Sequence, residues 1–515
     1  MADSMKGAFP APPFQEGLDW INTGGKALTL ADLRGKVLLL DFWTYGCINC
    51  MHIIPVVRQL EEKYANELIV IGVHSGKYIE ERVTENIRTA TWRLGVEHPV
   101  VNDRHFRTWR SYNVQAWPTV VLVSPDGQYI GQHSGEFTFE DFDKVLGAAV
   151  DTYSKAGMMS AEPLHFPLDP QPTPASRNGL RFPGKVLADP IQGRLFISDT
   201  ANHRVLVADV GRDGTSASVV SVIGSGTAGF KDGAVGDAML NHPEGLALQD
   251  DTLFIADKDN HSIRAANLSS GTIKTIAGTG AIGHSRQGGF GKDISLNSPW
   301  DVLESDNYLY IAMAGTHQIW RLILSTGRVE PFIGSGRENL DDGPHKSATL
   351  AQPSGLTTDE QRLFFADAES SAVRASDFSP DGYTQTLVGA GLFDFGDRDG
   401  SGLEARLQHC LGVAYHDGAI YVADAYNCKI KRVDLATKMC VTVLGSGEPG
   451  DLYEPGGLSV WEGQDGANAR LYIADTNNHR LLQSVIDKVG NLLPPIPVTL
   501  TFASDAASKF TDKDD

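Results

Sequence analysis

The chain has 515 residues, 54 of them glycine, and a formal net charge of −20. With 41% hydrophobic residues it can bury full cores in more than one domain, which excludes a disordered or collagen-like protein. Because an acidic surface repels a polyanion, nucleic acid is not expected as a partner. The longest basic cluster, Lys429, Lys431 and Arg432, alternates as on a solvated strand face.

No run of about 18 apolar residues and no leader-like N-terminus is present in the sequence. We therefore expect a soluble, cytoplasmic monomer without a membrane partner.

Residues 27–154 are predicted to form an α/β domain, preceded by an N-terminal extension over 1–26. The apolar runs 37–43 and 68–73 are typical of strands buried on both faces. Hydrophobic periodicity predicts helices over 50–64, 79–94 and 139–153. A further strand is expected at 119–123, with a turn at 124–127 and a return strand at 128–131.

Residues 155–178 lose this periodicity, and a stiff linker is predicted there from Pro163, Pro167, Pro170, Pro172 and Pro174. Beyond the linker a short apolar motif recurs six times, 51 to 58 residues apart. It occupies 195–199, 253–257, 309–313, 363–367, 420–424 and 471–475.

Each copy of the motif follows a segment rich in glycine and proline and precedes another short strand. Four strands per repeat at this period are typical of a propeller blade, so residues 179–502 are predicted to form an all-β six-bladed propeller. The last strand of the sixth blade is expected at 497–502, with 164–168 as the alternative. Residues 503–515 are expected to be a disordered tail.

A Cys-x-x-Cys sequence, Cys47 to Cys50, follows the first buried strand and opens the first predicted helix. The N–H groups and positive partial charge of a helix N-terminus favour a thiolate on Cys47, and the spacing of one turn lets Cys50 attack a mixed disulfide. Two inert cysteines and a zinc half-site are the alternatives. Zinc would need two more ligands, and only His52 lies close in sequence. We expect no metal and no cofactor.

Two further features of the sequence fit thiol chemistry. Asp41 lies near the end of the buried strand, where a poorly solvated carboxyl stays protonated and can relay the proton of the resolving thiol. A capping or solvent-facing aspartate is its alternative. Trp117-Pro118-Thr119 precedes another strand, a suitable place for a cis-proline that brings extended backbone alongside the cysteines.

Residues 37–135 resemble the thioredoxin fold of the TlpA and peroxiredoxin-like branch. The resemblance is carried by three motifs, Asp41-Phe42-Trp43, Cys47-x-x-Cys50 and Trp117-Pro118-Thr119. The resemblance implies that Cys47, Cys50, Asp41 and Pro118 are catalytic. It also implies that Trp43, Tyr45, Trp117 and Thr119 position the substrate. Ile48-Asn49 replaces the Gly-Pro found between the cysteines in thioredoxin, and this leaves the redox potential and direction open.

The sequence Asp-x-x-Asn-His-Arg, complete at 199–204 and 475–480, resembles the NHL repeat. Four histidines occupy equivalent places in it (His203, His261, His317 and His479). They are interpreted as structural, because equivalent sites on separate blades do not converge on one ion. A regulatory disulfide among Cys410, Cys428 and Cys440 is a further alternative.

The combination of the two domains resembles the NHL-repeat-containing protein 2 type over nearly the whole chain. It implies a thiol-disulfide oxidoreductase that acts on a protein disulfide or dithiol, with the propeller as a docking platform for a protein partner. The alternatives are a non-catalytic scaffold with a redox-sensing domain and a peroxide reductase. The last lacks the Pro-x-x-x-Thr-x-x-Cys arrangement before Cys47.

Overall fold

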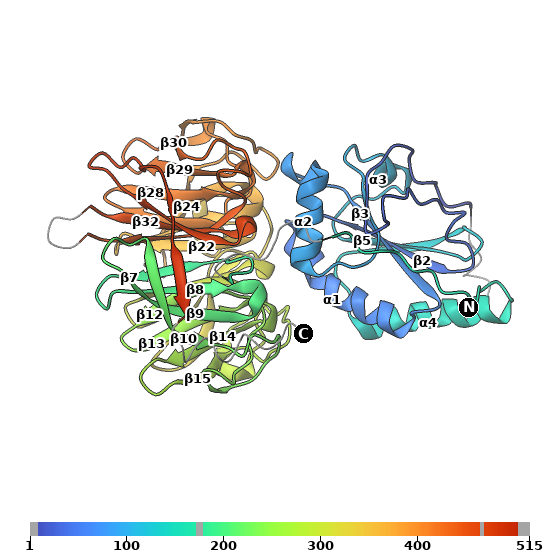
Figure 1. The fold of residues 1–515 in the computed structure, drawn as a ribbon, viewed down its shortest axis with the longest axis horizontal. Helices are drawn as coiled ribbons and strands as arrows, with labels where there is room; N and C mark the ends of the chain where they lie inside the picture. The colour runs from blue at the N-terminus through green and yellow to red at the C-terminus, as the bar shows by residue number, and fades with distance from the viewer. Residues whose placement is uncertain (1–8, 171–178, 464–467, 503–515) are drawn as a thin grey trace. The chain divides into compact units, whose positions relative to one another are not determined.

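The computed structural model describes residues 9–170, 179–463 and 468–502. The predicted tail 503–515, and Pro172 and Pro174 of the predicted linker, lie outside the described residues. The chain divides into two compact units, Met1–Pro174 and Ala175–Asp515, and each is described by itself (Figure 1). Within the described ranges, no helix is long and apolar enough to cross a membrane.

The first unit is α/β, as predicted, and is built on one mixed sheet. Its strands lie in the order β1 (Trp20–Ile21), β4 (Val100–Asn102), β3 (Leu68–His74), β2 (Val37–Trp43), β5 (Thr119–Val123) and β6 (Tyr129–Ser134). β2, β3 and β4 are parallel, and the other three strands run antiparallel to their neighbours. Every residue of the central strand β2 is buried, because side chains cover both faces of the sheet.

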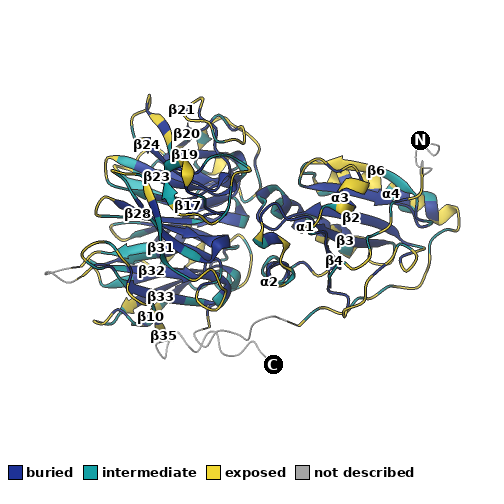
Figure 2. Cartoon of the chain, turned by 90° about the horizontal axis from the view of Figure 1, so that it is seen from above, coloured by how far each residue is buried: buried dark blue, intermediate teal, exposed yellow. Residues whose placement is uncertain are grey.

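Helices cover both faces of this sheet. Helix α1 (Ile48–Lys63) and helix α4 (Phe139–Lys155) share one core cluster with Leu39 of β2. Helix α3 (Arg107–Ser111) lies on the other face, where Trp109 packs with Leu40 and Phe42. Figure 2 shows β2 and β3 as buried, whereas β6 at the edge of the sheet is intermediate to exposed.

The segment predicted as one helix over 79–94 has two parts. A 3₁₀ turn, η2 (Glu80–Arg82), precedes helix α2 (Thr84–Leu94). Val83 between them is extended, with φ −82° and ψ 120°, so the helical backbone is interrupted there. Glu81 in the η2 segment is fully buried.

Two segments predicted to lie outside the α/β domain pack on it. In the N-terminal extension, Trp20 lies in β1, which pairs with β4, and its side chain joins the core. In the predicted linker, the Ser160 N–H donates to the Gly35 carbonyl at 2.9 Å, and Asp169 forms an ion pair with Arg88. Residues 9–26 and 158–170 are therefore parts of the first unit.

The second unit is a six-bladed β-propeller, as predicted, and each blade is an antiparallel sheet with four main strands. Blades 1 to 3 contain β7 (Val186–Asp189), β8 (Arg194–Asp199), β9 (Arg204–Val210) and β10 (Ser216–Ile223); β12 (Pro243–Gln249), β13 (Thr252–Asp257), β14 (Ser262–Asn267) and β15 (Thr272–Ala277); and β17 (Pro299–Ser305), β18 (Tyr308–Met313), β19 (Gln318–Ile323) and β20 (Arg328–Ile333).

Blades 4 to 6 contain β22 (Pro353–Thr358), β23 (Arg362–Asp367), β24 (Ala372–Asp377) and β25 (Tyr383–Val388); β27 (Gly412–His416), β28 (Ala419–Asp424), β29 (Lys429–Asp434) and β30 (Met439–Leu444); and β31 (Pro455–Trp461), β32 (Arg470–Asp475), β33 (Arg480–Val485) and β34 (Ile496–Pro497). The outer edges of blades 2 to 5 carry a further two-residue strand, β11 (Gly233–Ala234), β16 (Gly289–Phe290), β21 (Gly343–Pro344) and β26 (Gly400–Ser401).

The six repeated apolar motifs are the second strands of the six blades. The first strands, β7, β12, β17, β22, β27 and β31, each contact the next one around a closed ring. Their side chains and backbone line the channel on the ring axis.

The ring closes differently from the prediction. The fourth strand of blade 6 is only Ile496–Pro497, and the chain then crosses to blade 1. There β35 (Thr499–Phe502) pairs in parallel with β10, at the outer edge. Leu164 of the alternative segment packs on the core of the first unit instead. The Val498 N–H still donates to the Leu481 carbonyl of blade 6 at 2.8 Å. The physical reason for the crossing is that Val498 and Leu500 are buried in an apolar cluster formed mostly by blade 1.

Replacing Leu500 with aspartate is therefore expected to lower the free energy of unfolding of the propeller by about 3 kcal/mol. The change removes a side chain that is 6% exposed and buries a carboxylate in an apolar cluster. Urea unfolding followed by circular dichroism measures the effect. Thr501→Asp, on the exposed side of the same strand, is the matched control. If both variants unfolded at the same urea concentration, the burial of Leu500 in β35 would not stabilise the propeller.

Candidate active site

Cys47 and Cys50 lie where the chain leaves β2 and begins α1. Cys47 is the N-cap residue of α1, with φ −79° and ψ 119°, and its side chain makes no capping hydrogen bond. It is partly exposed, whereas Cys50 in the first turn is buried. Both are free thiols. The sulfur of Cys47 thus lies at the end of a helix whose first N–H groups have no intrahelical partner.

The two thiols differ in their electrostatic surroundings. Burial raises the pKa of the Cys50 thiol well above its usual range, and the Cys47 thiol beside it raises it further. A hydrogen bond from the Thr44 backbone offsets part of this effect. A buried, protonated thiol next to a partly exposed one is the arrangement needed for a resolving cysteine and a nucleophile.

Asp41 lies on β2 opposite Gly72 of β3, on the face that α1 covers. Burial raises the pKa of Asp41 to about 7, while the charge of nearby His98 lowers it and that of Glu61 raises it. The Oδ1 atom of Asp41 is buried without a hydrogen-bond partner. The Asp41 charge also raises the Cys50 pKa, so the structure brings these two groups together.

Trp117, Pro118 and Thr119 lie at the same edge of the sheet, because Thr119 begins β5 opposite Phe42 of β2. The Trp117–Pro118 peptide bond is cis, as expected from the sequence. The Trp117 indole Nε1–H donates to the Ser75 carbonyl at 3.0 Å, and the Ser75 N–H donates to the Trp43 carbonyl at 3.0 Å. This chain of bonds ties the proline loop to the end of β2.

Trp43 and Tyr45 flank the imidazole of His74, the last residue of β3. The Trp43 ring packs edge-on against it, with centroids 5.0 Å apart, and the Tyr45 ring stacks on it at 5.4 Å. Trp43 is 1% exposed and supports the loop before Cys47 from within the core. The predicted substrate contacts of both side chains stay predictions.

Two side chains that the sequence analysis missed accept backbone N–H groups of this loop. His74 Nε2 accepts from Tyr45 at 3.3 Å, and Glu81 Oε1 accepts from Gly46 at 3.0 Å. Burial lowers the pKa of His74 to about 3, so its ring is neutral and can accept. His74 could have been recognised from the sequence, because it is a polar residue at the end of an otherwise apolar strand. Glu81 gave no such signal, because it lies in a segment predicted as regular helix.

The histidines of the propeller repeat join neighbouring blades. Their Nδ1 atoms accept backbone N–H groups from the next blade around the ring: His203 from His242 at 3.3 Å, His261 from Ser298 at 3.0 Å, His317 from Gln352 at 3.1 Å and His479 from Phe182 at 3.0 Å. Ser371 replaces the histidine in blade 4 and accepts from His409 through its hydroxyl. These bonds support the structural interpretation. In the described ranges no three His, Cys, Asp or Glu side chains group to hold a metal.

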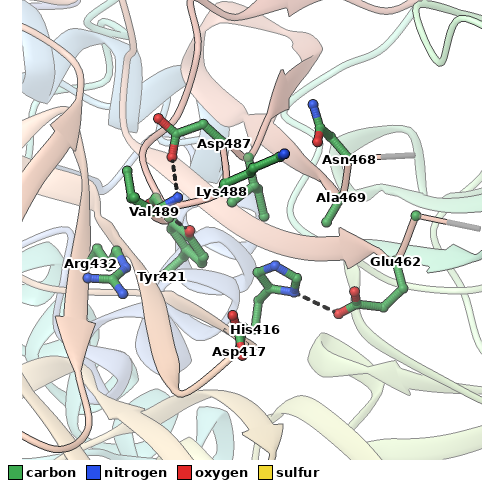
Figure 3. A pocket seen from close by; sticks show the side chains of 13 residues that line it. His416, Asp417, Tyr421, Arg432, Glu462, Asn468, Ala469, Asp487, Lys488 and Val489 are labelled. Carbon is green, nitrogen blue, oxygen red and sulfur yellow. Dashed lines mark hydrogen bonds and ion pairs between the residues drawn. The ribbon is translucent and has the colours of Figure 1, made fainter. Parts of the chain in front are cut away.

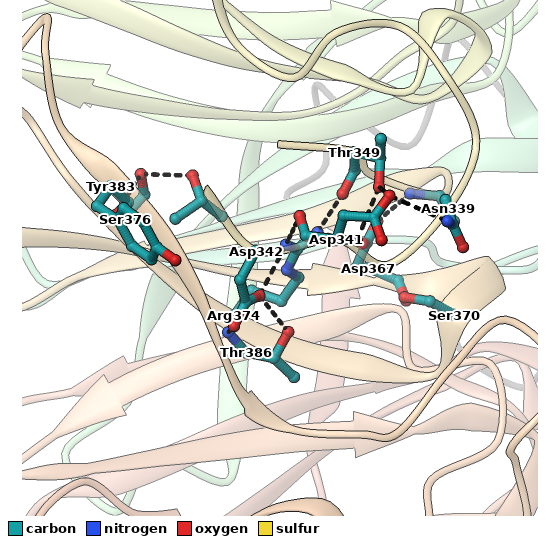
Figure 4. A network of polar contacts seen from close by, with 12 residues as sticks. Asn339, Asp341, Asp342, Thr349, Asp367, Ser370, Arg374, Ser376, Tyr383 and Thr386 are labelled. Atoms are coloured by element: carbon teal, nitrogen blue, oxygen red, sulfur yellow. Dashed lines mark hydrogen bonds and ion pairs between the residues drawn. The ribbon is translucent and has the colours of Figure 1, made fainter. Parts of the chain in front are cut away.

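Polar side chains form a partly buried network inside blade 4, shown in Figure 4. Arg374 forms ion pairs with Asp367 at 3.2 Å and Asp342 at 3.1 Å, and the Thr386 N–H donates to Asp342. In blade 5 Lys431 takes the arginine position; its side chain is fully buried and pairs with Asp397 and Asp399. The basic cluster predicted on a solvated strand face is therefore partly internal, because these carboxylates neutralise it.

The three propeller cysteines are buried free thiols. Burial raises the pKa of Cys440 to about 12 and that of Cys410 well above its usual range. Both are protonated at neutral pH, which makes them poor nucleophiles.

The propeller contains two pockets of about 340 Å³ each. The first, between blades 5 and 6, is polar, and its His416 Nδ1 lies 2.8 Å from Glu462 Oε1 (Figure 3). The second is the axial channel, where Lys185 Nζ donates to the carbonyls of Ser354 and Leu411 and lies 3.7 Å from Asp301 Oδ2. Lys185 thus joins strands across the ring.

The fold and the site define a thioredoxin-like domain fused to a six-bladed NHL propeller. A thioredoxin-like family model matches residues 35–129. The chain is 41% identical over 502 residues to the protein SUPPRESSOR OF QUENCHING 1, chloroplastic, of Arabidopsis thaliana, covering 92% of this chain and 46% of that protein. It is 39% identical over 532 residues to NHL repeat-containing protein 2 of Bos taurus, covering 95% of this chain and 71% of that protein. The chain belongs to the NHL repeat-containing protein 2 family.

The first unit alone is also similar to the thiol-disulfide oxidoreductase ResA of Geobacillus kaustophilus. The identity is 30% over 120 residues, covering 23% of this chain and 65% of that protein. The chain spans about half the length of the plant relative.

Proposed function

We propose that this protein is a thiol-disulfide oxidoreductase in which Cys47 is the nucleophile and Cys50 the resolving thiol. The observation that carries the proposal is the cysteine pair at the N-terminus of α1, one thiol partly exposed and one buried near Asp41. The similarity to a relative named thiol-disulfide oxidoreductase supports the same chemistry.

In the first step the Cys47 thiolate attacks one sulfur of a substrate disulfide. The substrate S–S bond breaks, a mixed disulfide forms, and the released substrate thiolate takes a proton. The Asp41 carboxylate then accepts the proton of the Cys50 thiol, and the Cys50 thiolate attacks the Cys47 sulfur. The second substrate thiolate leaves and is protonated, so the substrate gains two electrons and the protein becomes a disulfide.

A dithiol reductant returns the cysteines to the reduced form, and the same steps in reverse oxidise a dithiol substrate. In this scheme Pro118 presents extended backbone to the substrate, and Trp117 and Thr119 hold the loop around it. The substrate is a protein disulfide or dithiol, and the propeller docks the protein that carries it. The cytoplasmic location and the monomeric state remain predictions.

The proposal is tested by trapping. With Cys50→Ser the mixed disulfide cannot be resolved, so a substrate protein stays linked to Cys47 and is released by dithiothreitol. Non-reducing electrophoresis and mass spectrometry identify the linked protein and the cysteine that holds it. The double variant Cys47→Ser, Cys50→Ser is the control. Equal yields of adduct from both would reject the proposal and favour the scaffold alternative.

A further inference from the structure

The loop 44–46 immediately precedes Cys47. It is held by a hydrogen bond to Glu81, a buried side chain from a separate segment. Glu81 is 0% exposed, and its two oxygens accept different N–H groups. Oε1 accepts from Gly46, the residue before Cys47, and Oε2 accepts from Tyr78, both at 3.0 Å. Burial excludes the water that would compete for these hydrogen bonds, which strengthens them.

The turn 76–82 that presents Glu81 is itself braced. The Arg82 side chain donates from Nε to the Gly76 carbonyl at 3.1 Å and from Nη2 to the Lys77 carbonyl at 3.0 Å. The Arg82 carbonyl in turn accepts from Asn102 Nδ2 at 2.9 Å. A Cβ on Gly76 would lie 2.6 to 2.8 Å from the Glu81 backbone and Cβ, so only glycine lets the turn close this tightly. The backbone of Glu81 is therefore held in place by contacts that do not involve the loop 44–46.

Three consecutive N–H groups of this loop are hydrogen-bonded. His74 accepts from Tyr45, and Glu81 accepts from Gly46. The Cys47 N–H donates to the Thr44 carbonyl at 3.4 Å. The loop thus has few alternative conformations, and its fixed end sets where Cys47 begins α1. A nucleophile must meet a disulfide in line with the S–S bond, so small displacements of its backbone are costly to the rate.

We propose that Glu81 is a positioning residue of this site: by binding the Gly46 peptide it holds Cys47 in the geometry for attack on a disulfide. The expected effect of Glu81 on the rate of disulfide reduction rests on the proposed function. Its role in fixing the loop 44–46 does not. Glu81 acts through the loop and takes no part in the bond changes.

The test compares Glu81→Ala, Glu81→Gln and the control Glu85→Gln in the full chain. Glu85 belongs to the neighbouring helix, and its side chain is 70% exposed. Glu81→Ala is expected to lower kcat for reduction of a peptide disulfide about 10- to 100-fold with little change in KM. Glu81→Gln keeps one amide oxygen for the Gly46 N–H and is expected to remain within about threefold of the unsubstituted chain. Glu85→Gln is expected to have no effect.

Hydrogen–deuterium exchange supplies a readout that needs no substrate. In Glu81→Ala the amides of the segment 44–47 are expected to exchange at least about tenfold faster, because the Gly46 N–H loses its acceptor. The amides in the middle of α1 are expected to keep their protection, and Glu81→Gln is expected to restore it in the loop. Unchanged loop exchange in Glu81→Ala would overturn the proposal, as would a uniform loss of protection across the first unit.

Failure of the proposed function has a different signature. If the unsubstituted chain reduces no disulfide, the oxidoreductase proposal fails, and the exchange data alone decide whether Glu81 fixes the loop. If the unsubstituted chain is active and Glu81→Ala is equally active, the positioning role is rejected and the proposed function stands.

Discussion

Replacing Cys47 with serine is expected to lower the rate of disulfide reduction about 10³-fold or more, to the level of the uncatalysed reaction. A serine hydroxyl fits the space but is not ionised at neutral pH and forms no disulfide. The partly exposed thiol of Cys47 is thus lost, while the buried Cys50 remains protonated because burial raises its pKa. The assay is turnover of insulin disulfides with dithiothreitol as the reductant.

Cys440→Ser is the matched control, since it makes the same atomic change in a buried thiol of the propeller. Burial raises the pKa of that thiol to about 12, so it supplies no nucleophile and its loss is expected to leave the rate unchanged. A Cys47→Ser protein that kept more than a tenth of the activity would place the reactive thiol elsewhere.

Replacing Asp41 with asparagine is expected to slow the resolving step about 10²-fold at pH 8. In the unsubstituted chain this step should accelerate from pH 6 to pH 8, because the pKa of Asp41 is raised to about 7 and only the ionised carboxylate can accept the Cys50 proton. Asparagine cannot accept it, so the inflection near pH 7 should vanish. Reaction of the reduced protein with a dithiobis(nitrobenzoate) measures both thiols, since the second nitrothiophenolate is released only when Cys50 attacks.

The same substitution, although it slows the resolving step, is expected to raise the free energy of unfolding at high pH. Asp41 has a raised pKa in the folded state, so its contribution is most favourable in acid and is lost as the pH rises toward 7. Asp41→Asn should therefore stabilise the first unit at pH 8, by something on the order of 3 kcal/mol, and much less at pH 5. Asp151→Asn, an exposed change on α4, is the control for both experiments. Equal pH profiles for the resolving step in the two variants would remove Asp41 from the mechanism.

The elements that depend on local patterns were predictable from the sequence. The strand 37–43 and the six second strands of the blades are apolar runs with clear boundaries, and the structure has them at those residues. The position of the cysteine pair at the start of α1 was predictable as well, because it depends only on a strand followed by a helix. The break at Val83 was not, since the helical periodicity on either side is nearly continuous.

Pairings between distant segments escaped prediction for a common reason. Val498 and Leu500 alternate in a way that fits the edge of any sheet, and only the tertiary structure selects β10 as their partner. The contact between Glu81 and Gly46 is of the same kind, since 35 residues separate an unremarkable glutamate from the loop that it holds. Sequence patterns indicate which side chains are buried, but not which distant backbone groups those side chains meet.

The crossing of β35 to blade 1 has a consequence for the order in which the chain folds during synthesis. The described strands, helices and core of the first unit all lie within residues 9–170, so this unit can fold as soon as that segment has been synthesised. Blade 1, by contrast, acquires its outermost strand from residues 499–502, and its bond to His479 joins positions 297 residues apart. Loop closure of that length is slow. We therefore expect the first unit to be folded, with Cys47 and Cys50 in place, before the propeller gains its last strand.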